Sequence, residues 1–339
     1  MVVSTRSASC FVKLTCAGLF ATLAGCETFS LPASGTPRPG TYDQTTPLRY
    51  RLSARTYLVH VPRNYRAERA WPLVLVLHGA FSTAGEMEKW SGFSNLADRE
   101  DFVVAYPNGI GVFGFLQHWN AGHCCGLAAE DKVDDVGFLR YVIDDVSDRL
   151  RIDPQRVYVV GHSNGGMLAY HFASAYSPCL AGVGIVAGAL GSSQGARKPL
   201  RMIGPPQAPV PLIVIHGRED TNVPFEGGSG PRTVADRRYV SVFDSVECWA
   251  GYCGCEVTPQ VRADPQSGRH IMTWQDARGN AWVTLHVLEH WGHPWPSRLS
   301  IEKRRSKEDP LRTFDAAQTI WDFFRARSAA PPPSAGLQD

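Results

Sequence analysis

Residues 156–166 read Arg-Val-Tyr-Val-Val-Gly-His-Ser-Asn-Gly-Gly, and this stretch decides the fold of the 339-residue chain. Its β-branched valines suit a central parallel strand that is buried on both faces. The strand runs through Gly-x-Ser-x-Gly into a helix-forming segment at 167–173. Such a tight strand-to-helix turn lifts one serine hydroxyl clear of the backbone, and the flanking glycines let neighbouring chain pass closely. We therefore predict that Ser163 is a nucleophile, in preference to an incidental serine in an ordinary glycine turn.

A serine hydroxyl needs a base, and the base needs an orienting acid. After a turn of this kind, the acid and then the histidine follow at the ends of later strands. The apolar run at 211–217 leads directly to Glu219 and Asp220. Adjacent residues of an extended segment point in opposite directions, so only one of the two carboxylates should face the histidine. We predict that Asp220 is the acid, with Glu219 as the competing candidate.

The histidine is expected after the last strand, which we place at 281–289. His293 lies beyond that strand in a Gly-His-Pro-Trp-Pro loop, where a rigid turn can present its imidazole. His290 is the rival, and His286 is expected within the strand itself. We predict that His293 is the general base.

Two backbone amides should bind the oxyanion of the tetrahedral intermediate. One belongs to the residue after the nucleophile, here Asn164. The other comes from the loop after an earlier strand, and the apolar run at 72–77 is followed by His-Gly-Ala-Phe. We predict the amide of Ala80, with that of Phe81 as the alternative.

Together these motifs resemble the polyhydroxybutyrate depolymerase and feruloyl esterase family, which includes bacterial lipoprotein esterases. The resemblance covers roughly residues 55–325 and rests on Leu-His-Gly at 77–79, Gly-His-Ser-Asn-Gly-Gly at 161–166, His-Gly-Arg-Glu-Asp at 216–220 and Gly-His-Pro-Trp-Pro at 292–296. It is strengthened by Trp-Asn-Ala-Gly at 119–122, Cys-Cys-Gly at 124–126 and Val-Asp-Asp-Val-Gly-Phe at 133–138. It implies a serine carboxylesterase with an α/β-hydrolase fold, and by motif match it assigns Ser163, Asp220 and His293 as the triad.

The chain departs from the family pattern in two ways. Depolymerases of this group usually have cysteine in the loop after His-Gly, where this chain has Ala80. The oxyanion role needs only an amide, so the chemistry is unaffected. Secreted members that degrade polymers often carry an additional binding domain, and we see none here. Soluble or short esters are therefore the expected substrates, such as hydroxyalkanoate oligomers or feruloyl and other hydroxycinnamoyl esters.

Strand and helix patterns alternate along the chain, which predicts a doubly wound, mainly parallel sheet with the site at the carboxyl ends of its strands. The span 189–208 is short and rich in Gly, Pro and Ser, so we expect no large cap domain and an open site. Trp119 and Trp295 are the predicted substrate-binding walls. The alternative is that each tryptophan fills the core.

The composition fits a single catalytic domain, which we place at 48–328. The chain is 44% hydrophobic and has a net charge of +2, with its basic residues scattered. A nearly neutral chain gives no argument for a nucleic-acid partner. Residues 329–339 contain a proline run and are expected to form a disordered tail.

Residues 1–25 resemble the signal peptide of a bacterial lipoprotein. The apolar segment is too short to span a bilayer, and Leu-Ala-Gly-Cys at 23–26 resembles a lipobox. We expect Cys26 to carry lipid that anchors the protein to a membrane, with cleavage of an ordinary signal peptide as the alternative. Residues 26–47 lack periodicity and are expected to be a flexible tether. The protein should then be exported, either as a cell-envelope lipoprotein on the periplasmic or outer face or as an extracellular enzyme.

Export favours disulfides. Six cysteines remain after the N-terminal segment, which allows up to three bridges among Cys124, Cys125, Cys179, Cys248, Cys253 and Cys255. Neighbours such as Cys124 and Cys125 can bridge each other only in a strained ring, so we expect each to have a distant partner. Cys253 and Cys255 lack the usual zinc spacing. No metal or organic cofactor is expected.

Three functions fit these observations. The first is a serine carboxylic-ester hydrolase that forms an acyl-enzyme. The second is a serine peptidase or acyltransferase with the same triad. The third is an inactive surface lipoprotein that binds a polymer, and the complete set of predicted catalytic residues argues against it.

Overall fold

The computed structural model describes residues 30–32, 36–112, 114–193, 195, 197–233, 236–264, 268–307 and 309–328. The predicted signal peptide, Cys26 and the predicted tail lie outside these residues. In the described part of the chain, no helix has the length and apolarity needed to cross a bilayer.

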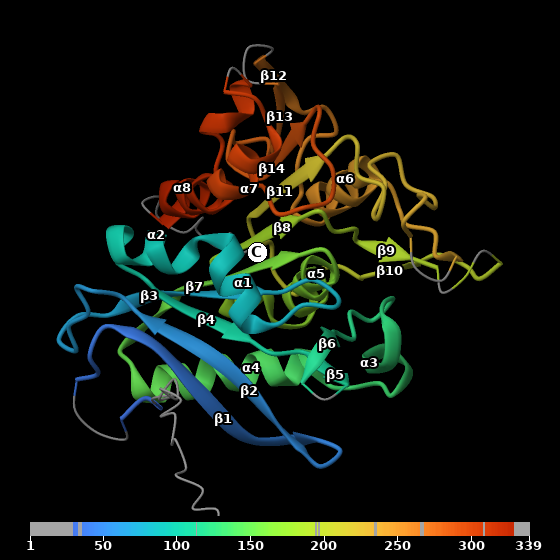
Figure 1. Ribbon diagram of the computed structural model, residues 1–339. Coiled ribbons are helices and arrows are strands. Elements are labelled where there is room, and N and C mark those ends of the chain that lie inside the picture. The colour runs from blue at the N-terminus through green and yellow to red at the C-terminus, as the bar shows by residue number, and fades with distance from the viewer. Residues whose placement is uncertain are drawn as a thin grey trace, which may run out of the picture.

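The centre of the fold is a ten-stranded sheet (Figure 1). Six neighbouring strands are parallel, in the spatial order β4 (Val103–Pro107), β3 (Trp71–Leu77), β7 (Ile152–His162), β8 (Gly182–Val186), β11 (Leu212–Gly217) and β14 (Ala281–Leu288). Both faces of β3 are buried, as its continuous apolar sequence predicts. The mainly parallel α/β sheet predicted from the sequence is thus confirmed.

Antiparallel strands extend the sheet at both edges. β1 (Gly40–Tyr50) and β2 (Ser53–Val61) form a hairpin beside β4, and β13 (Arg269–Gln275) and β12 (Gln260–Asp264) continue from β14. The predicted tether therefore ends earlier than residue 47. Its strand was missed because the side chains that β1 buries, Gln44 and Thr46, are polar and hide the apolar alternation of a half-buried strand.

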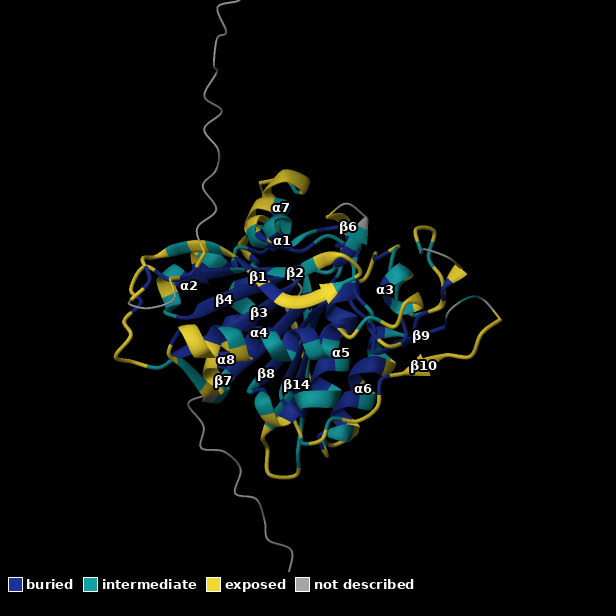
Figure 2. Ribbon diagram, turned by 90° about the horizontal axis from the view of Figure 1, so that it is seen from below, coloured by how far each residue is buried: buried dark blue, intermediate teal, exposed yellow. Residues whose placement is uncertain are grey.

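Helices cover both faces of the sheet. One face packs against α4 (Asp135–Arg149), α5 (Asn164–Tyr176) and α6 (Val242–Tyr252), and the other against α1 (Ala84–Ser91), α2 (Phe93–Glu100), α7 (Arg298–Arg304) and α8 (Ala316–Ser328). Strand β3 shows this division directly, since Leu73, Leu75 and Leu77 join the first core while Val74 and Val76 join the second. Figure 2 shows the central strands buried, with helices around them that range from α5, which has no exposed residue, to α7, which is mostly exposed.

The remaining elements are short. They are β5 (Ile110–Val112), β6 (Phe115–His118), α3 (Gly126–Glu130), β9 (Gly191–Ser192), β10 (Arg201–Met202), and the 3-10 turns Ser177–Cys179 and Pro310–Thr313. Within 189–208 the described residues form only the two-residue strands β9 and β10, in agreement with the prediction of no large cap domain.

A buried ion pair joins the first hairpin to α4. Arg55 Nη2 lies 2.7 Å from Asp135 Oδ1, and both side chains are buried. The other Asp135 oxygen accepts a hydrogen bond from the Asn120 amide at 2.7 Å. The pair therefore also holds the start of the loop that reaches the predicted site.

Replacing Arg55 with methionine should leave the Asp135 carboxylate buried without its charge partner. We expect Arg55→Met to lower the free energy of unfolding by about 3–5 kcal/mol, measured by urea denaturation at pH 7. The matched control is Arg51→Met, which removes an exposed pair with Asp131. That control should cost no more than about 1 kcal/mol. An equal decrease in the free energy of unfolding in the two variants would contradict the claim that the buried pair stabilises the fold more than the exposed pair.

Candidate active site

Ser163 stands at a strained turn between β7 and α5. Its backbone adopts φ 53° and ψ −121°, a conformation that L-residues rarely adopt. Glycine is required on both sides because a Cβ on Gly161 would collide with the Gly165 carbonyl, and a Cβ on Gly165 would collide with the His78 carbonyl. The helix can therefore leave the strand so sharply that the Ser163 hydroxyl faces the end of the sheet.

Three side chains from distant parts of the sequence meet at this hydroxyl. His293 Nε2 lies 2.9 Å from Ser163 Oγ, and His293 Nδ1 lies 2.7 Å from Asp220 Oδ2. Asp220 follows β11 and His293 follows β14, so the ends of adjacent parallel strands supply both residues. An imidazole held in this way can accept the serine proton while its other nitrogen donates to the carboxylate.

The two competing residues lie elsewhere. Glu219 and His290 hydrogen-bond to each other at 3.1 Å, and their side chains are 63% and 76% exposed. His286 lies within β14 and is buried. Of these candidates, His293 contacts Ser163 and Asp220 contacts His293.

Asp220 is held as a carboxylate in a buried position. Its Oδ1 accepts hydrogen bonds from the Asn222 and Val223 amides at 2.8 and 2.9 Å. Burial by itself raises the pKa of this carboxyl, but the hydrogen bonds and charges of His216 and His293 outweigh burial and hold its pKa well below the usual range. The carboxylate therefore stays charged and can balance an imidazolium at His293.

The His293 loop is fixed by its neighbours. The His162 Nε2 atom lies 2.9 Å from the His293 carbonyl oxygen, within hydrogen-bonding distance. Burial lowers the pKa of His162 to about 4, so this ring is neutral near pH 7 and can donate from Nε2 alone. Sequence reasoning missed this role because His162 belongs to the nucleophile motif and shows no link to the distant loop.

The backbone amides of Ala80 and Asn164, which the sequence predicts as oxyanion donors, differ from that of the alternative, Phe81, in their hydrogen bonding. The Phe81 N–H donates to the Gln117 carbonyl at 2.6 Å. Among the described residues, no acceptor lies within hydrogen-bonding range of the Ala80 and Asn164 amides. Both residues line the same cavity as Ser163, which has a volume of about 310 Å³. Ala80 and Asn164 therefore remain available to bind an oxyanion, whereas Phe81 does not.

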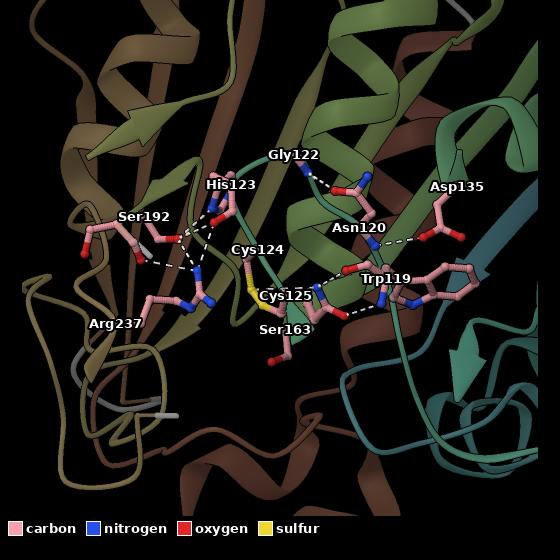
Figure 3. The surroundings of a disulfide bond; sticks show 12 residues. Trp119, Asn120, Gly122, His123, Cys124, Cys125, Asp135, Ser163, Ser192 and Arg237 are labelled. Atoms are coloured by element: carbon pink, nitrogen blue, oxygen red, sulfur yellow. Dashed lines mark hydrogen bonds between the residues drawn. A yellow bond between two sulfur atoms is a disulfide. The ribbon is translucent and has the colours of Figure 1, made fainter. Parts of the chain in front are cut away.

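The loop at 119–125 packs beside Ser163 (Figure 3). The Asn164 side chain accepts from the Trp119 amide at 2.7 Å and donates to the Trp119 carbonyl at 3.1 Å. The Asn164 side chain therefore bonds both backbone groups of Trp119, as a neighbouring strand would. It fixes the loop in place, a role that the motif alone did not indicate.

Cys124 and Cys125 form a disulfide with each other. The expectation of distant partners is therefore wrong for this pair, because two adjacent residues of the loop bridge each other, and Cys125 lines the cavity. Cys179, Cys248, Cys253 and Cys255 are free thiols, so the described residues contain one bridge rather than three.

The two predicted tryptophan walls lie outside the Ser163 cavity. Trp119 is fully buried, its ring centroid lies 4.7 Å from that of His78, and its Nε1 donates to the His78 carbonyl. Trp119 is therefore a core residue, and the prediction for it is wrong. Trp295 is also nearly buried and lines a separate hollow of about 620 Å³. Two residues, His162 and Trp90, line both hollows.

Exposed aromatic side chains at the cavity are instead Phe81 and Trp90, which are 57% and 52% exposed. The sequence did not predict these two walls, because periodicity alone does not distinguish an exposed aromatic residue on a loop or helix from a core residue.

Comparisons with known proteins find similarity to esterases. The family model described as esterase PHB depolymerase matches residues 55–213. The chain is 29% identical over 295 residues to the esterase NocK of Nocardia uniformis, covering 80% of this chain and 79% of that protein. It is 28% identical over 284 residues to a feruloyl esterase C of Aspergillus oryzae, covering 82% and 86% of the two chains.

The fold is also found in a solved structure. Acetyl xylan esterase from Aspergillus awamori superposes with a TM-score of 0.56 at 16% sequence identity, covering 78% of this chain and 98% of that one. This likeness, at low identity, concerns the fold. The resemblance drawn from the sequence motifs is confirmed: residues 55–213 match the model of the esterase PHB depolymerase family, and the fold is that of the α/β-hydrolases.

Proposed function

We propose that the protein is a serine carboxylic-ester hydrolase in which Ser163 is the nucleophile, His293 the general base and Asp220 the orienting acid. The observation that carries this proposal is the chain of hydrogen bonds from Asp220 through His293 to Ser163, which ends in a cavity with two unpaired amides. The family match and the esterase relatives support the class of reaction.

In the first half-reaction, His293 Nε2 accepts the proton of Ser163 as Oγ bonds to the ester carbon. The carbonyl electron pair moves to the oxygen, which the Ala80 and Asn164 amides stabilise. Asp220 balances the charge of the imidazolium. The tetrahedral intermediate then expels the alcohol, whose oxygen takes the proton from His293. Water repeats the sequence on the acyl-enzyme and releases the acid.

We propose hydroxyalkanoate oligomers or hydroxycinnamoyl esters as the substrates. The family description names depolymerases of polyhydroxybutyrate, and the Aspergillus oryzae relative is named a feruloyl esterase. A cavity of about 310 Å³ with exposed Phe81 and Trp90 at its walls suits a chain-like or aromatic ester.

We further propose that the protein is exported and anchored through a lipid on Cys26. The support is the Leu-Ala-Gly-Cys motif after a short apolar segment. Mass spectrometry of the mature N-terminal peptide checks this, since an unmodified Cys26 would contradict it.

Removing the proposed nucleophile or acid should abolish most activity. We expect Ser163→Ala to lower kcat on 4-nitrophenyl butyrate by a factor on the order of 10⁴ or more, and Asp220→Asn to lower it by about 10⁴, both with little change in folding. The matched control is Glu219→Gln, because the neighbouring carboxylate pairs with His290 at the surface. If Glu219→Gln were as damaging as Asp220→Asn, the assignment of the acid would be wrong.

The proposed base also predicts a pH dependence. A protonated imidazole cannot accept the serine proton, so kcat/KM should fall about tenfold per pH unit on the acid side. The pKa of Asp220 is held low and that of His162 is lowered to about 4, so neither group should limit activity between pH 5 and 7. Initial rates on a neutral ester between about pH 4 and 7 test the prediction, and a flat profile down to about pH 4 would contradict it.

A further inference from the structure

Arg237 is a buried cation in the wall of the Ser163 cavity. Arg237 is 8% exposed, and it lines the cavity together with Ser163 and His293. Figure 3 shows it beside His123 and Ser192, next to the Cys124–Cys125 bridge. The mechanism proposed above does not use it.

Only one end of this guanidinium is occupied by protein. Nη1 donates to the His123 carbonyl at 2.9 Å and to Ser192 Oγ and the Ser193 carbonyl at 3.2 Å each. Among the described residues, Nε and Nη2 have no hydrogen-bond partner and no carboxylate forms an ion pair with Arg237. The three bonds fix the position of the group, and its remaining N–H donors are left free.

A buried charge without a counter-charge is costly, and burial accordingly lowers the pKa of Arg237. Among the described residues that line the cavity, the only carboxylate is the exposed Glu130, and a second arginine, Arg232, lies in the same wall. Neither arginine has an acidic partner among the described residues. The lining described therefore carries two arginines against one exposed carboxylate and has a net positive charge.

We propose that Arg237 binds a carboxylate on the substrate, so that the preferred esters are those that bear a free acid group besides the scissile bond. With Nη1 held by protein, the edge formed by Nε–H and Nη2–H is free, and this edge matches a carboxylate geometrically as well as electrostatically. Such an ester would supply the missing counter-charge on binding. This inference rests on the proposed function and narrows its substrate class to anionic esters, such as short hydroxyalkanoate oligomers with a free carboxyl end.

The test compares esters that differ only in this charge. One pair is the linear dimer of 3-hydroxybutyrate as the free acid and as its primary amide, which places the charge on the alcohol part. The other pair is 4-nitrophenyl hydrogen adipate and the corresponding adipic monoamide ester, which places it on the acyl part. We expect wild-type kcat/KM to favour the acid about tenfold or more in at least one pair. Equal rates for acid and amide in both pairs would overturn the proposal.

Substitutions test whether Arg237 is the residue that causes the preference for the acid over the amide. Arg237→Gln should bring the ratio of acid to amide close to one, and Arg237→Lys should retain part of it. The matched control is Arg238→Gln, since Arg238 is exposed, donates to the Lys198 carbonyl and does not line the cavity. Arg238→Gln should keep the full preference. A preference that survives Arg237→Gln would overturn the assignment to Arg237.

Two further readouts keep the outcomes separate. If Arg237→Gln fails to fold because the bonds to buried carbonyls are lost, the wild-type ratio and Arg237→Lys still test the proposal. Hydrolysis of 4-nitrophenyl butyrate that depends on Ser163 tests the proposed function itself. Its presence without any preference for the acids refutes this inference alone, whereas its absence refutes the proposed function.

Discussion

The close crossing of backbone at Gly161 and Gly165 is the constraint on which the rest of the site depends. Neither position has room for a Cβ, because carbonyl groups of the turn and of the strand end at His78 occupy the space. The crossing forces Ser163 into a strained conformation and aims its hydroxyl away from the strand. The sheet then brings the loops after β11 and β14 to the same edge, where Asp220 and His293 meet that hydroxyl.

The same turn also organises the opposite wall of the cavity. Asn164 follows the nucleophile directly, and its side chain pairs with both backbone groups of Trp119. The loop that continues from Trp119 carries the Cys124–Cys125 bridge, and Arg237 clamps it through the His123 carbonyl. One short motif therefore positions the proposed nucleophile, one of the proposed oxyanion amides and a loop that lines the cavity.

The sequence predicts those features that depend on local pattern. Ser163, Asp220 and His293 each follow an apolar strand and precede a glycine- or proline-marked turn, so their positions at the sheet edge follow from topology. The local sequence around Trp119 and Arg237 does not predict what these two side chains contact. Whether a tryptophan fills the core or an arginine faces a cavity depends on contacts with distant segments, such as His78 for Trp119 and Ser192 for Arg237. The disulfide was likewise misjudged because the path of a loop decides its partner. The sequence did not predict β1, because the side chains that it buries are polar.

The most direct measurement of the central claim is covalent labelling with a 4-nitrophenyl alkylphosphonate, followed by peptide mass spectrometry. An activated serine attacks phosphorus and releases nitrophenol, so one adduct per chain should form, on Ser163. Labelling should become at least about a hundredfold slower in His293→Ala, because the hydroxyl then lacks its base. An adduct on another residue, or labelling of Ser163 at an unchanged rate in His293→Ala, would contradict the account.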